Sequence, residues 1–219
     1  MTGKPQLVAQ AHTKKGPWHP KRVFNVTAMN NSYEPGSSFR FPPNEFNVLS
    51  MASIRSAENG TASYIYTDKR GRLILFNDSG KIEWTGEEGF GGSTLSYEIP
   101  KDSTSFSEKQ FEYFQPTNIV YDMKSDGKTE LFVVKNVEAS NYLFENARSF
   151  KRGGIEIHTI NDLGISFENV PKKFPGMVTG MAVNDYDNDS KDELLVTMIK
   201  TGNRLSNSVS SVVVAYELE

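Results

Sequence analysis

The chain of 219 residues has no cysteine, which excludes disulfide frameworks, zinc ribbons and thiol nucleophiles. Histidine is scarce as well, since His12, His19 and His158 are the only three and are too scattered for a histidine-rich metal site. Lysine and arginine number 24 against 27 acidic residues, so the net charge of −3 argues against a nucleic-acid partner. No apolar run approaches the roughly 18–20 residues of a membrane span, and the N-terminus has no apolar segment typical of a signal peptide. Composition therefore predicts a soluble globular protein without membrane insertion.

Short segments rich in β-branched and aromatic residues alternate with turn residues, and this pattern predicts an all-β protein. The expected strands are Arg22–Thr27, Ser63–Thr67, Arg72–Phe76, Lys81–Trp84, Asn118–Tyr121, Glu130–Val134, Gly154–His158, Ile165–Glu168, Val178–Val183, Glu193–Thr197 and Ser211–Tyr216. Helical periodicity is weak and favours only two short helices, within Ser105–Phe114 and Ser140–Phe150. A parallel fold of alternating strands and helices is therefore not expected.

One unit recurs along the chain, an apolar strand followed by an acidic loop and a second apolar strand. Its clearest copies are Ile119–Val134 and Met181–Val196, and Phe46–Leu75 is similar except that its loop, Ser53–Gly60, has lost most of its acids. A period of about 60 residues with about four antiparallel strands per unit predicts roughly three blades of a β-propeller. An ordinary β-sandwich is the alternative.

The predicted organisation is an N-terminal arm over residues 1–45 and blades over 46–219, divided at about 46–115, 116–175 and 176–219. A propeller ring needs about four to eight blades. We therefore consider three alternatives: the C-terminal piece of a longer protein with Met1 added for expression, a ring completed by another chain, or an open curved stack. The third blade lacks a fourth strand, and Arg22–Thr27 either fills that place or is the outer strand of a preceding blade.

The strongest local motif is the acidic loop Asp185–Glu193. Its odd positions one, three, five, seven and nine are Asp185, Asp187, Asp189, Lys191 and Glu193, where Lys191 offers a backbone carbonyl. Oxygen ligands at this spacing suit calcium, and carboxylates so close together repel one another without a cation. Ser190 at position six, where glycine is usual, strains a left-handed turn. The loop predicts one structural Ca²⁺ site, and a solvated acidic turn is the alternative.

A second, degenerate loop follows Ile119–Tyr121. It keeps acids at positions one, five and nine, namely Asp122, Asp126 and Glu130, but position three is Lys124. A charged lysine has only hydrogen-bond donors and is no metal ligand, so its ammonium replaces the ion electrostatically. We expect a weak metal site here or none.

Both loops lead into a Glu-Leu strand and resemble the FG-GAP/VCBS repeats of bacterial calcium-loop β-propellers. Other segments share this resemblance, which covers about residues 46–219: Lys69–Trp84, Gly86–Ser93, Phe132–Asn136, Arg148–Phe150, Asp162–Gly164 and Val213–Leu218. The resemblance implies export across a membrane, calcium-stabilised loops and no known catalytic residues.

These observations predict a non-catalytic module that binds a protein or a glycan at the cell envelope, in the periplasm, at the outer membrane or outside the cell. Gly89–Thr94 lacks the Lys-Ser/Thr of a phosphate-binding loop, and Glu87 with Glu88 is more typical of a solvated turn than of a hydrolase. The alternatives are a part of a larger exported enzyme and a structural subunit that assembles with itself.

Overall fold

The computed structural model describes twelve segments of the chain. They are residues 7–14, 16–19, 22–29, 32–38, 40–41, 46–55, 62–100, 109–139, 148–161, 164–167, 172–201 and 208–218. These residues form antiparallel strands and one short 3-10 helix, η1 (Val48–Ser50), so the prediction of an all-β protein is confirmed. A helix long and apolar enough to cross a membrane is not found among them.

The first large sheet is an antiparallel meander in which strand order follows the chain. Its strands are β4 (Ala52–Arg55), β5 (Ala62–Thr67), β6 (Leu73–Asn77) and β7 (Ile82–Thr85). Side chains at the ends of β5 and β6 build the turns that lead into the next strands, β6 and β7. Asp68 Oδ1 accepts the backbone N–H groups of Arg70 and Arg72, and Asn77 Oδ1 accepts those of Ser79 and Lys81. Asp and Asn favour such turns because their side chains replace backbone hydrogen-bond partners.

The second sheet repeats this plan around one long central strand. Its strands are β10 (Ile119–Tyr121), β11 (Glu130–Val134), β12 (Val137–Glu138), β13 (Phe150–Asn161), β14 (Gly164–Phe167) and β15 (Lys172–Phe174). β12 continues β11 along one edge of β13, while β14 and β15 share the other edge. The sheet is therefore four strands wide, like the first one.

The third sheet is three strands wide among the described residues. Its strands are β16 (Met177–Asn184), β17 (Glu193–Thr201) and β18 (Val209–Glu217). The predicted strand near Arg22 forms, but it belongs elsewhere: β2 (Val23–Met29) pairs with β1 (Leu7–Gln10) and β3 (Ser32–Ser38) in an N-terminal sheet. The expectation that it fills the fourth place beside β18 is therefore wrong.

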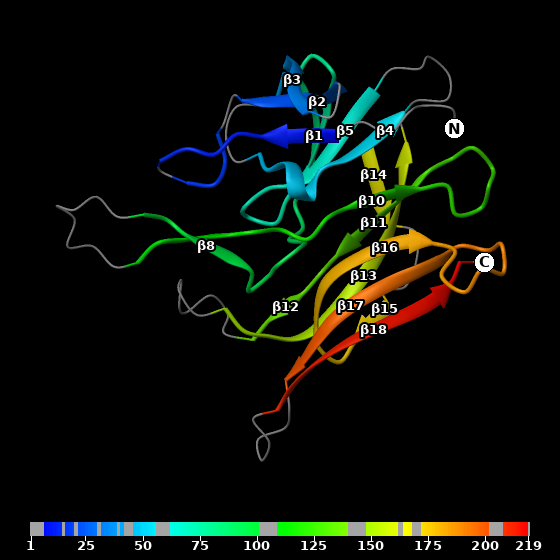
Figure 1. The fold of residues 1–219 in the computed structure, drawn as a ribbon. Helices are drawn as coiled ribbons and strands as arrows, with labels where there is room; N and C mark the ends of the chain where they lie inside the picture. The colour runs from blue at the N-terminus through cyan, green and yellow to red at the C-terminus, as the bar shows by residue number, and fades with distance from the viewer. Residues whose placement is uncertain are drawn as a thin grey trace.

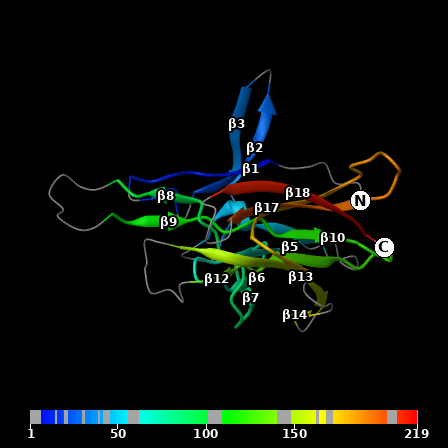
Figure 2. The same cartoon turned by 90° about the horizontal axis from the view of Figure 1, so that it is seen from below.

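The remaining two strands form a ribbon that extends away from the large sheets, as Figures 1 and 2 show. β8 (Ser96–Glu98) pairs with β9 (Phe111–Tyr113), so the helix predicted within Ser105–Phe114 is wrong where the structure describes it. A cross-strand partner overrides the weak helical spacing of the phenylalanines. The other predicted helix lies mostly outside the described residues, and Phe150 at its end begins β13.

The sheets pack face to face in chain order, and each interface is a separate hydrophobic core (Figure 1). Alternation along the central strands divides the side chains between neighbouring cores. In β6, Leu73 and Leu75 face the second sheet, whereas Ile74 and Phe76 face the N-terminal sheet. In β11, Leu131 and Val133 face the first sheet by the same alternation, whereas Phe132 and Val134 face the third. β6 and β11 are buried on both faces, which explains their continuous apolar sequences.

Candidate metal centre

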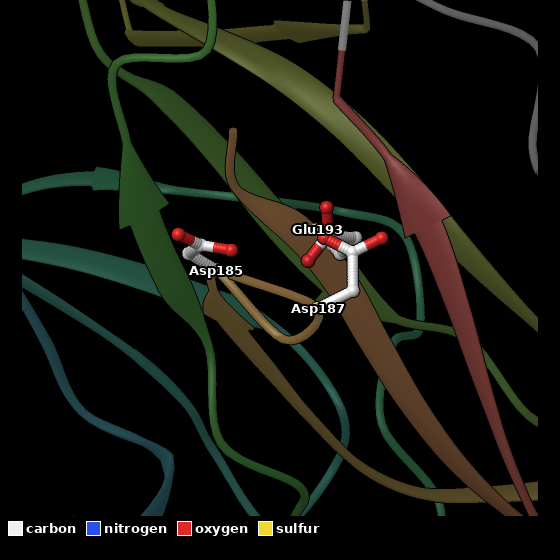
Figure 3. Close-up of side chains that lie close together, drawn as sticks. All are labelled: Asp185, Asp187 and Glu193. Atoms are coloured by element: carbon white, nitrogen blue, oxygen red, sulfur yellow. The ribbon is translucent and has the colours of Figure 1, made fainter. Parts of the chain in front are cut away.

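The acidic loop between β16 and β17 brings three predicted ligands together. One carboxylate oxygen from each of Asp185, Asp187 and Glu193 lies within 4.8 Å of the others (Figure 3). Glu193 is buried at the first position of β17, Asp185 is half-buried just after β16, and Asp187 is exposed. It is the only such group of three among the residues that the structure describes. The three oxygens lie close enough together to contact one cation.

Hydrogen bonds from carboxylates to backbone N–H groups set the shape of this loop. Asp185 accepts from Asp189 through Oδ1 (3.1 Å) and from Ser190 through Oδ2 (3.0 Å). Glu193 Oε2 accepts from the N–H of Tyr186 at 2.6 Å. These bonds fold the loop back on its own ends, so the carboxylates converge through local geometry rather than through packing against a distant segment.

The other two predicted ligands take different places. Asp189 is not part of the group of three, and its Oδ1 accepts the N–H of Lys191 at 2.9 Å. The Lys191 ammonium forms an ion pair with Glu217 at the end of β18. Lys191 therefore ties the loop to the last strand of the third sheet through its side chain, which leaves only its backbone carbonyl for a metal.

The degenerate loop between β10 and β11 has the same hydrogen-bond pattern. Asp122 accepts from the N–H groups of Asp126 (3.1 Å) and Gly127 (2.9 Å), and Glu130 Oε2 accepts from Met123 (2.9 Å). Both loops also have left-handed backbone at their fourth and sixth positions, which are Ser125 and Gly127 here, and Asn188 and Ser190 in the other loop. The two loops are therefore equivalent in backbone structure, although their acids differ.

Lys124 distinguishes the degenerate loop from the intact one. Its Nζ lies 3.8 Å from Oε1 of Glu130, a glutamate that is almost fully buried. Asp187 occupies the equivalent third position of the other loop and lies beside Glu193. Lysine thus brings a positive charge to the glutamate where the intact loop brings another negative charge, and Asp122, Asp126 and Glu130 form no group of three. This arrangement agrees with electrostatic compensation by the lysine.

The backbone at Ser190 leads to a first prediction. Its φ of 72° lies in the left-handed region, which costs an L-residue about 1–2 kcal/mol, partly offset by the larger entropy that glycine loses on folding. We expect Ser190→Gly to raise the free energy of unfolding by roughly 0.5–1 kcal/mol. The reciprocal variant Gly127→Ser, at φ 83° in the other loop, should lower it by a similar amount. Urea denaturation measures both, and equal stabilities would contradict the assigned strain.

A tyrosine connects the two loops, which the sequence did not indicate. Tyr121, at the end of β10, donates its hydroxyl to Oδ2 of Asp192 at 2.6 Å. This hydrogen bond, with partial burial, raises the pKa of Tyr121 to about 12, because ionisation would place two negative charges together. Asp192 also accepts the Leu218 N–H through its backbone oxygen at 3.2 Å. The loops therefore lie at the same end of neighbouring sheets.

A second group of charged residues connects the first and second sheets. The Lys135 ammonium lies 2.8 Å from Glu88 and 3.0 Å from Glu156, and Glu156 lies 3.3 Å from Nε2 of His158. Burial lowers the pKa of His158 although Glu156 opposes it, so the imidazole is neutral at neutral pH. Burial also acts to lower the pKa of Lys135, but its hydrogen bonds to both glutamates outweigh burial and raise it. Lys135 and the two glutamates thus form a structural ion network, whereas Nε2 of the neutral His158 is buried and makes no hydrogen bond.

The loop of the third predicted repeat is described only at its start. Ser53 to Arg55 belong to strand β4, so the loop begins later than the sequence suggested, and residues 56–60 lie outside the described residues. Comparison of the chain with protein-family models, with curated proteins and with solved structures found no match.

Proposed function

We propose that the chain is a non-catalytic interaction module of the β-propeller type, stabilised by one calcium ion in the loop from Asp185 to Glu193. One observation carries this proposal. Two loops share one backbone structure, yet only one of them gathers three carboxylates within 4.8 Å. The other loop places a lysine beside its buried glutamate. Lys124 brings a positive charge to the buried glutamate of its loop, whereas the intact loop brings Asp187 to Glu193 and would be stabilised by a bound cation.

Calcium is the cation that this ligand set favours. All candidate ligands are oxygens, and the loop sequence supplies them at alternate positions, as flexible calcium loops do. Asp187 is exposed, so the site is open to water molecules that complete a coordination shell of about six to eight ligands. Ser190 in a strained left-handed position weakens the loop, and weak calcium loops suit the millimolar calcium outside the cytoplasm. We therefore propose a periplasmic, outer-membrane-associated or extracellular setting.

The packing of the sheets supports the propeller part of the proposal. Three antiparallel meanders follow one another in the chain and pack face to face, which is the arrangement of successive blades. The first strands of the meanders are neighbours, since β10 contacts both β4 and β16. In a propeller, first strands meet in this way around the central channel. The resemblance to FG-GAP/VCBS repeats belongs to this same proposal.

The module would act by presenting its surface to a protein or glycan. Lys135 pairs with Glu156 within the second sheet and with Glu88 beyond β7 of the first sheet. The carboxylates of the acidic loops accept hydrogen bonds from the backbone of their own loops. We therefore assign a structural role to both groups. Part of a larger exported enzyme, a ring completed by another chain and a self-assembling subunit are the alternatives. Hydrolytic turnover by this chain alone would contradict the non-catalytic proposal.

Calcium removal tests the metal site. In millimolar calcium we expect a melting temperature a few degrees higher than in chelator, since binding at about 5–50 times the dissociation constant stabilises by about 1–2 kcal/mol. Magnesium should give a smaller shift because it loses its water less readily. Differential scanning fluorimetry measures the shift, and isothermal titration calorimetry measures a stoichiometry of one ion per chain.

Matched variants locate the ion. Asp187→Asn removes one carboxylate of the group without losing the loop-closing bonds of Asp185, and it should abolish the calcium shift. Asp126→Asn, in the equivalent loop, should leave the shift intact. A calcium shift that persists in Asp187→Asn, or no shift in the unaltered protein, would refute the metal site.

A further inference from the structure

The exposed edge of the third sheet is a long strand without the features that protect sheet edges. β18 spans Val209–Glu217 and pairs with β17 without any register shift, and no other described strand pairs with it. Figure 1 shows it at the margin of the molecule. The outer strands of the first two sheets, β7, β14 and β15, are only three or four residues long. β3 is longer, but it contains Pro35 and a register shift interrupts its pairing with β2. Edges are usually blunted by shortness, proline, bulges or lysine.

The C-terminal end of β18 shows which of its residues direct their backbone N–H and C=O groups toward β17. Leu218 donates its N–H to Asp192 O, and Glu217 lies opposite Glu193 in the ladder. Backbone groups alternate between the two edges of an antiparallel strand, so the even-numbered residues of β18 point to β17. The five odd-numbered residues direct their N–H and C=O groups to the open edge, and their side chains are exposed; they are Val209, Ser211, Val213, Ala215 and Glu217.

We propose that this edge pairs with the same edge of a second copy, antiparallel and centred on Val213. A two-fold axis there places Val213 opposite its equivalent and Ser211 opposite Ala215, and each of these is an outward-pointing residue. The two strands therefore form one continuous hydrogen-bonded ladder with matching parity. The inference deepens the scaffolding role proposed above by naming a second copy as the partner of this edge, and it does not depend on calcium.

Charge supports a second copy as the occupant. β18 contains one charged residue, Glu217, at its C-terminal end, where it pairs with Lys191. In the two-fold arrangement each Glu217 lies opposite Val209 of the other copy, so the two glutamates are roughly 25 Å apart. The rest of the strand is uncharged and lacks glycine and proline, which leaves no repulsion across the pair. A parallel pairing in register would instead place the two glutamates side by side.

Charge substitution at the two-fold axis tests the proposal. In analytical ultracentrifugation, we expect the unaltered protein to shift from monomer to dimer as its concentration is raised about 100-fold. Val213→Lys and Val213→Glu each place like charges opposite one another and should weaken the dimer on the order of 100-fold. An equimolar mixture of the two variants should recover a dimer, because opposite charges then face each other. Circular dichroism and melting temperature check that both variants fold.

Hydrogen exchange gives a second measurement on the unaltered protein. Amides of Ser211, Val213 and Ala215 should become protected as the protein concentration rises, whereas those of Val212 and Val214, bonded to β17, should be protected throughout. Three results would overturn the proposal. They are a monomer at all concentrations, a dimer that neither Val213→Lys nor Val213→Glu weakens, and a mixture of these two variants that stays monomeric. The calcium shift has a separate outcome, so failure of one proposal does not imply failure of the other.

Discussion

Phe76→Ala should reduce the free energy of unfolding by about 3–5 kcal/mol, one of the largest losses expected from a single substitution in this chain. Phe76 is fully buried in β6, in the core between the first sheet and the N-terminal sheet. Its ring centroid lies 5.4 Å from that of Tyr64, 5.5 Å from Phe41 and 5.8 Å from Tyr66. Truncation removes these aromatic contacts and leaves a cavity that rigid strands on both sides cannot close.

The same substitution should loosen the N-terminal sheet specifically, because this core is what joins it to the first large sheet. Urea denaturation measures the stability, with a melting temperature lower by roughly 10 °C. Limited proteolysis should show faster cleavage near β2 and β3. Ile82→Ala, on the exposed strand β7 of the same sheet, is the control and should cost less than about 1 kcal/mol. Equal losses in the two variants would contradict the assignment of this core.

The strands that were predictable from the sequence are those with strong patterns of their own. β6 and β11 are continuous apolar segments because neighbouring sheets cover both faces, and the turns around them contain Asp, Asn and Gly. β17 and β18 were predicted from their β-branched and apolar residues, although one face of β18 is exposed and both strands extend further than expected. Local composition therefore sufficed wherever burial and turn chemistry agreed.

Most of the missed strands are short, and several depend on partners distant in the sequence. β3 has seven residues but contains Pro35 and Gly36, which hide its strand pattern. β8 and β9 form only because Ser96 and Tyr113 lie opposite each other, and β12 and β15 only because β13 is long enough to pair with both. Such short segments carry too few residues for a periodic signal. Pairing, and not propensity, decides their structure.

The candidate metal centre likewise has some features that the sequence predicts and others that it does not. The convergence of Asp185, Asp187 and Glu193 was predictable because their spacing lies within one loop. The hydrogen bond from Tyr121 to Asp192 and the ion network around Lys135 were not predictable, because each joins segments from different sheets. Chemistry confined to one loop is visible in a sequence, whereas chemistry assembled between sheets needs the fold.

Asn136 illustrates this dependence most clearly, because its side chain joins all three large sheets. It follows β11, and its Nδ2 donates to the backbone oxygens of Gly92, after β7, and Val178, in β16, both at 2.7 Å. Its Oδ1 accepts the Val178 N–H at 2.9 Å. A Cβ at Gly153 would lie 2.3 Å from that Oδ1, so glycine is required there for the close approach. Backbone hydrogen bonds between Gly91 and the end of β11 also join the first two sheets, and the Asn136 amide adds the link to β16 of the third.

Asn136→Ala should therefore cost about 3–5 kcal/mol, from three lost hydrogen bonds and the backbone groups of Gly92 and Val178 left without partners. It should also reduce cooperativity between the sheets. Tryptophan fluorescence, which reports on Trp18 and on Trp84 in β7, would then follow a different urea transition from far-UV circular dichroism, which follows all sheets. Asn184→Ala, at the exposed end of β16, is the control and should be close to neutral. Coincident transitions and a loss below about 1 kcal/mol would show that apolar packing alone holds the sheets together.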